Sequence, residues 1–373
     1  MILSQQQIDY CMECGVCTGS CPVSRVLPTF SPRQMIKRTL MDRDETILQS
    51  RELWACLTCA RCSSRCPVQI DFPDFARTHR EMARKEGSLP QLTHHGALQA
   101  IIQLQTRNIR QKRTDWARDV GKFQTTGDTF YFVGCAPYFD AVIKYGDTSL
   151  EMARSVLTLF NRIGIEPVLS DDERCCGHDA LWSGNEELFR RLVSLNLEVI
   201  RGSRAKAVVF SCPEGYATYK YHVPKYFGEL PFEVFHTTEF FARELPGAGI
   251  AFRPASESNR EVVTYQDPCR LGRVAGIYEA PRELLKMLPE TTFQEMGRNR
   301  ENALCCGTAT WIECSNYSKT MQIERLEEAR GVGAGTMVTT CPKCRIHLTC
   351  AQSNTDLNLN IVDLYTFLLN RME

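Results

Sequence analysis

Cysteines dominate the chemistry available to this chain of 373 residues, which contains 19 of them. One short pattern occurs twice near the N-terminus, as Cys11-x2-Cys14-x2-Cys17-x3-Cys21-Pro22 and Cys56-x2-Cys59-x2-Cys62-x3-Cys66-Pro67. Three thiolates at this spacing curl around one face of an iron–sulfur cube, and the fourth, before the proline, points to another cube. The doubled pattern therefore predicts two cubane [4Fe–4S] clusters.

By the same rule the two patterns exchange their last cysteines. The ligands expected for the first cluster are Cys11, Cys14, Cys17 and Cys66. Those expected for the second cluster are Cys56, Cys59, Cys62 and Cys21. Zinc ribbons are disfavoured because they pair two CxxC knuckles across a long spacer. Disulfides are disfavoured because the first ten residues lack the basic and apolar regions of a secretion signal.

A second cysteine system lies in the C-terminal two thirds and is duplicated. Its first copy comprises Cys135, Cys175-Cys176-Gly177 and Cys212-Pro213, and its second comprises Cys269, Cys305-Cys306-Gly307 and Cys341-Pro342-Lys343-Cys344. Corresponding anchors are 134, 130 and 129 residues apart, which indicates an internal duplication. Adjacent thiols reach one site only in a turn, which the following glycine allows. Five thiolates exceed what tetrahedral zinc uses, so the second copy predicts an unusual iron–sulfur site.

The first copy lacks one of these cysteines. Gly215 stands where the second copy has Cys344, so four cysteines remain, namely Cys135, Cys175, Cys176 and Cys212. Four thiolates can hold zinc, an ordinary cubane, or a cluster with an open or differently ligated iron. His178, directly after the CCG turn, is a candidate substitute ligand, although a packed or solvent-facing histidine is the more common role. The metal at this site therefore stays open.

The elements that position these cysteines change in type along the chain. Ser31-Pro32 with Gln34 predicts a capped helix start, and a further helix is expected over 44–54. Asp71 is the expected N-cap of a third helix that ends near Gly87. Beyond residue 128, expected strands alternate with expected helices. The strands are placed at 129–134, 205–211, 261–266 and 336–340, and the helices at 149–163, 185–200, 281–288 and 316–330. This alternation predicts parallel sheets with cysteines at the C-terminal ends of strands.

The expected fold class is α+β and multi-domain. A helical ferredoxin-like domain with two [4Fe–4S] clusters spans 1–90, and a helical connector spans 91–127. Two duplicated α/β modules with CCG turns follow over 128–250 and 251–373. The connector carries a basic group, for which a solvated helix face is favoured over a docking site for an acidic partner; its members are Arg107, Arg110, Lys112 and Arg113.

Charge and hydropathy exclude several classes of function. The 44 basic and 44 acidic side chains cancel, so no net field favours a nucleic acid. No apolar run approaches the length of about 18 residues that a membrane-spanning helix needs. No G-x-G-x-x-G loop occurs, so a flavin or nicotinamide is expected in a partner. Cys314 and Cys350 have no partners at useful spacing and are expected to be buried as small hydrophobic residues.

The duplicated CCG motif, preceded by a two-cubane domain, resembles heterodisulfide reductase of methanogens and its relatives. Residues 1–90 resemble the iron–sulfur subunit of that family and residues 128–373 resemble its CCG subunit, so the whole chain is similar to the fused D-type form. The resemblance implies a noncubane [4Fe–4S] cluster held by Cys269, Cys305, Cys306, Cys341 and Cys344. At the altered first CCG site, with its four cysteines, a second iron–sulfur cluster or zinc is expected.

The function implied is an iron–sulfur electron-transfer subunit of a larger anaerobic oxidoreductase. Electrons are expected to pass between the two cubanes and the noncubane cluster, with flavin- or ferredoxin-containing partners and a disulfide or quinone-linked acceptor. The expected location is the cytoplasm, including the periphery of a membrane complex. The alternative is a complete disulfide reductase with its active site between the two CCG modules. The missing ligand at Gly215 favours the first hypothesis, and the intact second site disfavours a zinc scaffold.

Overall fold

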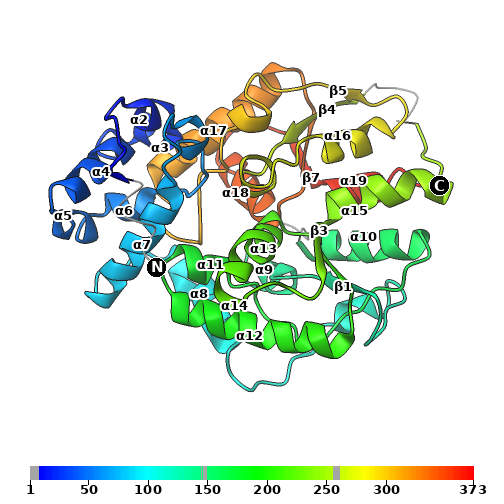
Figure 1. Ribbon diagram of the computed structural model, residues 1–373. Coiled ribbons are helices and arrows are strands. Elements are labelled where there is room, and N and C mark those ends of the chain that lie inside the picture. Colours follow the sequence, from blue (N-terminus) through cyan, green and yellow to red (C-terminus); the bar gives the residue numbers. More distant parts are fainter. Residues whose placement is uncertain (1–7, 144, 146–148, 255–260) are drawn as a thin grey trace.

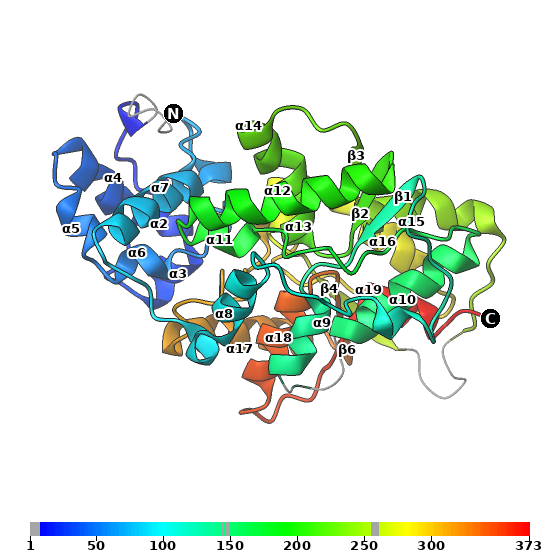
Figure 2. The ribbon, with the colours of Figure 1, turned by 90° about the horizontal axis from the view of Figure 1, so that it is seen from below.

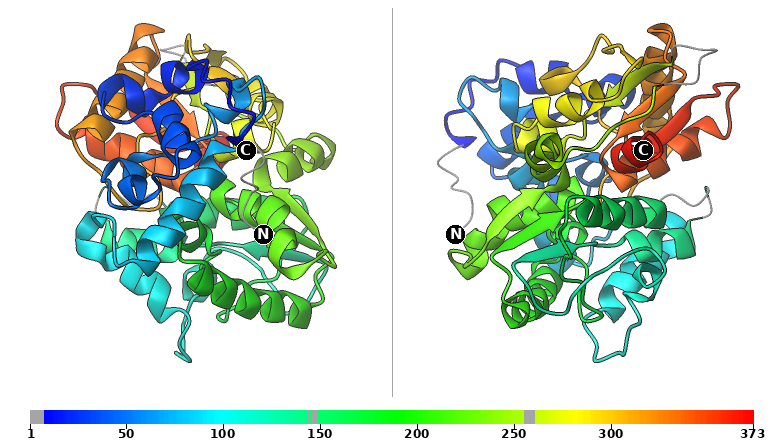
Figure 3. Two further views of the ribbon diagram at one scale, coloured as in Figure 1. Left: turned by 60° about the vertical axis from the view of Figure 1, so that its left-hand side comes forward. Right: turned by 90° about the vertical axis from the view of Figure 1, so that its right-hand side faces the viewer.

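The computed structural model describes residues 8–143, 145, 149–254 and 261–373. These residues form a group of short helices that lies beside two stacked α/β units, as Figures 1 and 3 show. The helical group is coloured blue in both figures, the first α/β unit cyan to green, and the second yellow to red. None of the helices in the described part of the chain has the length and apolar character of a membrane span.

The N-terminal group, as far as the structure describes it, contains seven short helical segments. They are α2 (Val16–Ser20), α3 (Pro22–Val26), α4 (Pro32–Leu40), α5 (Glu45–Leu48), α6 (Glu52–Ala55), η1 (Ser63–Arg65) and α7 (Phe72–Lys85). Two predicted caps are confirmed: Ser31 Oγ accepts from the Gln34 amide at 3.3 Å, and the Asp71 carboxylate accepts from the Asp74 amide at 3.2 Å. The single helix expected over 44–54 is wrong, because the Ser50 hydroxyl donates to the Ile47 carbonyl at 2.9 Å in a turn that separates α5 from α6.

The connector contains η2 (Thr93–Gly96), α8 (Ala97–Leu104) and η3 (Asp115–Ala117). Its basic group does not form one solvated helix face. Arg113 is buried and pairs with the Glu173 carboxylate at 2.8 Å, whereas the other three cations are exposed. The expectation therefore fails at Arg113, whose buried acidic partner lies 60 residues further along the chain.

The two α/β units each contain a parallel sheet, which confirms the predicted alternation. The first sheet has the order β1 (Thr129–Phe132), β2 (Ala207–Phe210), β3 (Glu233–His236). The second has the order β5 (Thr292–Phe293), β4 (Val262–Gln266), β6 (Thr336–Thr339), β7 (Asn360–Asp363). Strands β3, β5 and β7 were not predicted, because β5 has only two residues and because β3 and β7 pass directly into helices.

Helices follow the strands in both units. In the first unit they are α9 (Ala136–Val142), α10 (Ser149–Arg162), α11 (His178–Trp182), α12 (Glu186–Ser203), α13 (Pro213–Ala217), η4 (Thr218–His222), α14 (Val223–Phe227), α15 (Thr237–Glu244) and η5 (Leu245–Ala248). In the second they are η6 (Arg270–Val274), α16 (Glu279–Lys286), η7 (Arg300–Asn302), α17 (Asn316–Gly331), α18 (Pro342–Gln352) and α19 (Leu364–Leu369).

The two units share one hydrophobic core, built where their helices meet. Helix α10 packs against α19, and α15 packs against α16. Exchanging the two copies of the duplicated sequence turns one contact into the other, so the units are related by an approximate twofold axis. Phe160, Phe241 and Tyr365 are fully buried in this shared core. The packing holds the C-terminal ends of both sheets, and the cysteines there, in a fixed relation.

Candidate iron–sulfur sites

The first predicted cubane quartet surrounds a cavity in the N-terminal helical group. Cys11, Cys14, Cys17 and Cys66 all line this cavity, which holds about 430 Å³ of empty volume. Gly15 has φ 79° and precedes α2, a backbone conformation that favours glycine. Cys14 is exposed while Cys11 and Cys17 are half-buried, so the quartet reaches the protein surface.

The second predicted quartet lies deeper in the protein. Cys56, Cys59 and Cys62 are buried, and their charges interact with that of Cys21 from the other sequence pattern. Burial raises the pKa of the Cys21 thiol to about 12, because the apolar surroundings disfavour a thiolate. Thiols of this kind bind a metal only by releasing protons. The structure thus brings each proline-linked cysteine to the triplet of the other pattern.

Arg80 of α7 supports the second quartet and was missed in the sequence. Its guanidinium group is fully buried and donates to four backbone carbonyls, those of Leu53, Trp54, Cys56 and Trp182. These bonds fix the chain where it enters Cys56 and join it to α11 of the first unit. Burial raises the pKa of Cys56, and the positive charge of Arg80 opposes that rise. An arginine in an amphipathic helix carries no sequence signal of this role.

The five cysteines of the second CCG copy converge at the C-terminal ends of β4 and β6. The charge of each thiol interacts with that of the next in the order Cys269, Cys305, Cys306, Cys344, Cys341. Side-chain hydrogen bonds from Cys305 and Cys344 lower the pKa of Cys306 to about 6. Gly307 has φ 80°, and a Cβ there would lie 2.8 Å from the Ser318 carbonyl oxygen. The CCG turn therefore requires glycine at this position.

The four cysteines of the first CCG copy line a cavity of about 410 Å³. The Sγ atoms of Cys135 and Cys175 lie 3.6 Å apart, and the charge of Cys176 interacts with that of Cys212. A Cβ built on Gly215 would lie 3.0 Å from the ring of Phe210 and 3.6 Å from the Cβ of Cys176. Phe210 ends β2, at the position that Thr339 takes at the end of β6. An aromatic ring thus borders the place of the absent fifth cysteine.

The two CCG sites touch each other. The charge of Cys341 interacts with that of Cys212 across the approximate twofold axis. Beside them, the buried ammonium group of Lys343 contacts the carboxylates of Asp179 at 2.5 Å and Glu214 at 2.6 Å. Glu214 and Lys343 occupy equivalent positions in the two copies, each directly after the Cys-Pro pair. The duplication has therefore placed opposite charges at the junction of its two halves.

His178 belongs to this junction and does not offer a free ring nitrogen. Its Nδ1 bonds the Asp179 carboxylate at 3.0 Å, and its Nε2 accepts from Arg270 Nε at 3.2 Å. The ring is 2% exposed, and burial lowers its pKa. Asp179, Glu214 and His178 offer ligand atoms within 4.8 Å of one another, but the Lys343 ammonium group already pairs with both carboxylates. The packed histidine, rather than a substitute ligand, agrees with this geometry.

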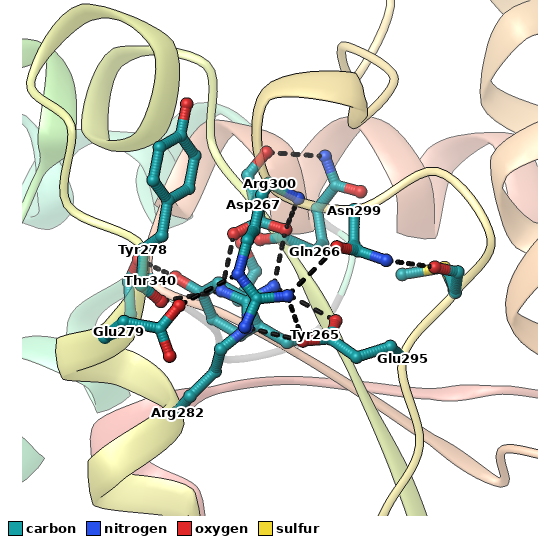
Figure 4. Close-up of polar contacts among 12 residues, drawn as sticks. Tyr265, Gln266, Asp267, Tyr278, Glu279, Arg282, Glu295, Asn299, Arg300 and Thr340 are labelled. Atoms are coloured by element: carbon teal, nitrogen blue, oxygen red, sulfur yellow. Dashed lines mark hydrogen bonds and ion pairs between the residues drawn. The ribbon is translucent and has the colours of Figure 1, made fainter.

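Buried ion pairs fix the chain just before each single cysteine. Figure 4 shows Arg282 between two carboxylates, with nitrogen–oxygen distances of 2.8 and 2.9 Å to Asp267 and 2.6 and 3.0 Å to Glu295. Asp267 lies two residues before Cys269. In the first unit, Glu173 accepts from the amides of Val133 and Gly134, at 3.1 and 2.8 Å. Both carboxylates hold a cysteine-bearing loop, and neither shows a motif in the sequence.

The two remaining cysteines depart from expectation. Cys314 is exposed and Cys350 is half-buried, so neither is a buried hydrophobic residue as predicted. The Lys319 ammonium group donates to Cys350 Sγ at 3.0 Å, and the Cys350 thiol contacts the Tyr145 hydroxyl at 3.0 Å. These polar partners lie 31 and 205 residues from Cys350 in the sequence, which is why spacing gave no indication of them.

Comparison with known proteins agrees with the two cysteine systems. A family described as a 4Fe-4S dicluster domain matches residues 7–70, and one described as a cysteine-rich domain matches residues 129–218 and 263–349. Among solved structures, a hypothetical protein from Helicobacter pylori is similar in fold, with a TM-score of 0.56, 10% identity, and coverage of 98% of this chain and 74% of that chain.

Three curated relatives illustrate the range of similar proteins. A component of dihydromethanophenazine:CoB--CoM heterodisulfide reductase from Methanosarcina barkeri is 30% identical over 64% of this chain and 58% of its own length. An EtfAB:quinone oxidoreductase from Syntrophomonas wolfei is 28% identical over 73% of this chain and 39% of its own. A component of fumarate reductase (CoM/CoB) from Methanothermobacter marburgensis is 26% identical over 91% of this chain and 67% of its own.

Fold and cysteine sites together define an iron–sulfur protein with one dicluster domain and two cysteine-rich CCG domains. The chain joins these domains in one polypeptide, and it is similar to the D-type heterodisulfide reductase component of Methanosarcina barkeri over 64% of its length. It spans about 58% of the length of the relative from Methanosarcina barkeri.

Proposed function

We propose that this protein is an electron-transfer subunit of a larger anaerobic oxidoreductase, with the domain division at 1–90, 91–127, 128–250 and 251–373. Two [4Fe–4S] cubanes are held by Cys11, Cys14, Cys17 and Cys66, and by Cys56, Cys59, Cys62 and Cys21. A noncubane cluster is held by Cys269, Cys305, Cys306, Cys341 and Cys344. A second cluster, or zinc, occupies the site of Cys135, Cys175, Cys176 and Cys212. The observation that carries the proposal is that each of these four cysteine groups lies next to the following one.

Each group of cysteines adjoins the next. Cys62 of the second quartet lines the cavity of the first quartet. The charge of Cys59 interacts with that of Cys305, which joins the second quartet to the second CCG site. The charge of Cys341 then interacts with that of Cys212 of the first CCG site. A series of adjacent redox centres can carry electrons from the exposed Cys14 region into the interior.

The polypeptide's own part is to bury, space and charge these centres, while the clusters supply one-electron chemistry when bound. Arg273 donates to the carbonyls of Cys59 and Ala303, at 2.8 and 2.7 Å, and so spans the second quartet and the second CCG site. Arg80 and Arg270 add positive charge near the same path, since the charges of both act on Cys56. Positive charge beside an anionic cluster favours its reduced form and tunes the potential.

The proposed electron path indicates where redox partners bind. The exposed cavity of the first quartet suits docking of a flavin- or ferredoxin-containing subunit in the cytoplasm or at a membrane complex. Two relatives carry names that refer to a heterodisulfide and to a quinone, which supports a disulfide or quinone-linked acceptor here.

A second candidate function is reduction of a disulfide between the two CCG sites. The interaction between Cys212 and Cys341 favours it, because one substrate could reach both sites. The buried contacts of Lys343 with Asp179 and Glu214 oppose it, since they occupy the same junction. The altered site at Gly215 opposes it further, and we therefore prefer the electron-transfer function.

The test follows cluster reduction by EPR in anaerobic protein supplied with a reduced low-potential ferredoxin. Replacing Cys59 with Ser interrupts the second cubane and is expected to slow reduction of the CCG cluster by tenfold or more, with its iron retained. The matched control Cys314→Ser alters an exposed cysteine outside the four groups and is expected to leave the rate unchanged. Equal rates in wild type and Cys59→Ser would contradict the proposed path.

A further inference from the structure

A pocket outside the four cysteine groups is lined by residues of α8, of α11 and of the segment 310–312. Figure 2 shows α8 beside α11. The pocket holds about 1070 Å³ of empty volume, part of which is open to solvent. Much of its lining is apolar, including Leu89, Leu92, Ala100, Ile102, Leu188 and Ile312. Leu89 and Leu92 are exposed at 62% and 42% despite their size. A concave apolar wall of this kind is typical of sites for small organic molecules.

Two residues that line the pocket each carry a buried polar atom with no hydrogen-bond partner within the described protein. The hydroxyl oxygen of Thr310, a residue only 1% exposed, and the buried side-chain Oε1 of Gln99 make no hydrogen bond with any described residue. The amide nitrogen of Gln99 is engaged, because it donates to the carbonyls of Thr310 and Trp311 at 3.3 and 3.0 Å. Leaving a buried polar atom unpaired is unfavourable. A water or a ligand can supply the missing partner.

The backbone around these atoms is held in an unfavourable conformation on both sides of the pocket. Thr310 and Trp311 have φ of 52° and 58°, and His94 and His95, at the start of α8, have φ of 51° and 52°. The two segments are joined by a hydrogen bond from the Thr93 amide to the Trp311 carbonyl at 2.9 Å. A β-branched residue such as threonine rarely adopts positive φ, and such strain concentrates at ligand-binding sites.

The pocket lies where the segments after the two CCG turns meet. Ala180 follows Cys176 by four residues and Thr310 follows Cys306 by four, and both line it. Asp179 of the same wall contacts Lys343, between Cys341 and Cys344. A molecule in this pocket therefore lies close to both CCG sites without displacing the charges at their junction.

The chemistry of the residues that line the pocket limits the class of molecule that it can bind. Its ionic groups are Asp179, which Lys343 already neutralises, with Arg84 and His95, and these described lining residues include no cluster of cations to bind a multiply anionic ligand. The unpaired groups are one hydroxyl donor and one amide acceptor. A quinone presents carbonyl oxygens, which accept from the Thr310 hydroxyl, and the corresponding quinol presents hydroxyl groups, which donate to Gln99 Oε1.

We propose that this pocket binds a neutral organic molecule of the quinone class and holds it beside the CCG sites through Thr310 and Gln99. The inference deepens the electron-transfer function proposed above and rests on it for its physiological meaning. Binding can be measured separately from electron transfer, and the test below measures it in fully oxidised protein.

The probe is menadione, with its binding to anaerobic, cluster-loaded protein measured by titration calorimetry. Thr310→Val keeps the branched shape and removes only the hydroxyl, and is expected to weaken menadione binding about three- to tenfold. Ala100→Trp fills the pocket from the exposed face of α8 and is expected to abolish it. The control Thr264→Val makes the same change at a buried, unpartnered threonine of β4 outside the pocket, and should leave binding unchanged.

Iron content is measured in every variant, so that loss of folding is recognised independently. The proposal is overturned if wild type with complete clusters does not bind menadione, or if Ala100→Trp binds it as well as wild type. Binding of oxidised glutathione in place of menadione, abolished by Ala100→Trp, would overturn the quinone class in favour of a disulfide. Menadione binding that depends on Thr310, in protein whose clusters do not accept electrons from ferredoxin, would support the pocket and reject the proposed function alone.

Discussion

Gly215 and Phe210 act together at the altered CCG site. The missing cysteine is visible in the sequence by alignment of the two copies, but its neighbour is not, because the contact with Phe210 is tertiary. A Cβ at residue 215 would meet the Phe210 ring at 3.0 Å, tighter than ordinary van der Waals contact. The site has thus lost a possible ligand and gained an apolar wall at the same place.

This pairing predicts that Gly215→Cys alone does not restore a fifth ligand. The new side chain is expected to press on Phe210 and lower the free energy of unfolding by about 1–3 kcal/mol, without a change in the cluster spectrum. Gly215→Cys combined with Phe210→Thr copies the residues of the second site, Cys344 and Thr339, and should remove the clash. EPR and iron analysis of the two variants check this, and a changed spectrum in the single variant would show that Phe210 does not block the site.

The buried contacts of Lys343 lead to a second prediction at the scale of residues, which concerns the unfolding free energy. Lys343→Met removes the buried cation and leaves Asp179 and Glu214 facing each other, which is expected to cost about 3–5 kcal/mol of unfolding free energy. The control Lys85→Met removes an exposed partner of Glu81 and is expected to leave the unfolding free energy nearly unchanged, because solvent screens this pair. Anaerobic urea unfolding measures both. Equal effects would mean that Lys343 does not neutralise the junction.

At the scale of elements, several helices and four of the strands could be predicted because their signals are local. The caps at Ser31 and Asp71 and the strands leading to Cys135, Cys212, Cys269 and Cys341 appear where periodicity placed them. Strands β3 and β7 could not be predicted, because each passes directly into a helix, α15 or α19, through a single capping residue. For α15 that residue is His236, whose Nδ1 accepts from the Thr238 amide at 3.2 Å.

The cap of α15 predicts a pH dependence. Burial lowers the pKa of His236 to about 3, against about 6.5 in the unfolded chain. The unfolded state therefore binds the extra proton between these values, and stability is lost as the pH falls below about 6.5. At pH 5 this one group is expected to account for about 2 kcal/mol.

His236→Asn tests this dependence, because asparagine caps a helix without titrating. Its unfolding free energy is expected to fall less steeply than that of wild type between pH 7 and 5, whatever its value at pH 7. His95→Asn, at an exposed position, serves as the control with the wild-type slope. A slope unchanged by His236→Asn would show that His236 is not buried as a neutral ring.

At the scale of the whole molecule, the duplicated CCG units and the dicluster domain form one connected system. Sequence spacing predicted the membership of each cysteine group, because ligand spacing is local. It could not predict that Cys212 contacts Cys341, that Arg80 joins the helical group to α11, or that α8 and segment 310–312 enclose a pocket. Each of these depends on how units distant in sequence pack, through the shared core around Phe160 and Tyr365.

The measurement that tests the central claim most directly is iron and acid-labile sulfide per chain in anaerobically purified protein, compared between wild type and Cys344→Ser. Two cubanes and one CCG cluster predict at least about twelve irons in wild type. Cys344→Ser is expected to lose about four of them and to keep the eight or so of the cubanes. About eight irons in wild type, or loss of the cubanes together with the CCG cluster in Cys344→Ser, would contradict the account.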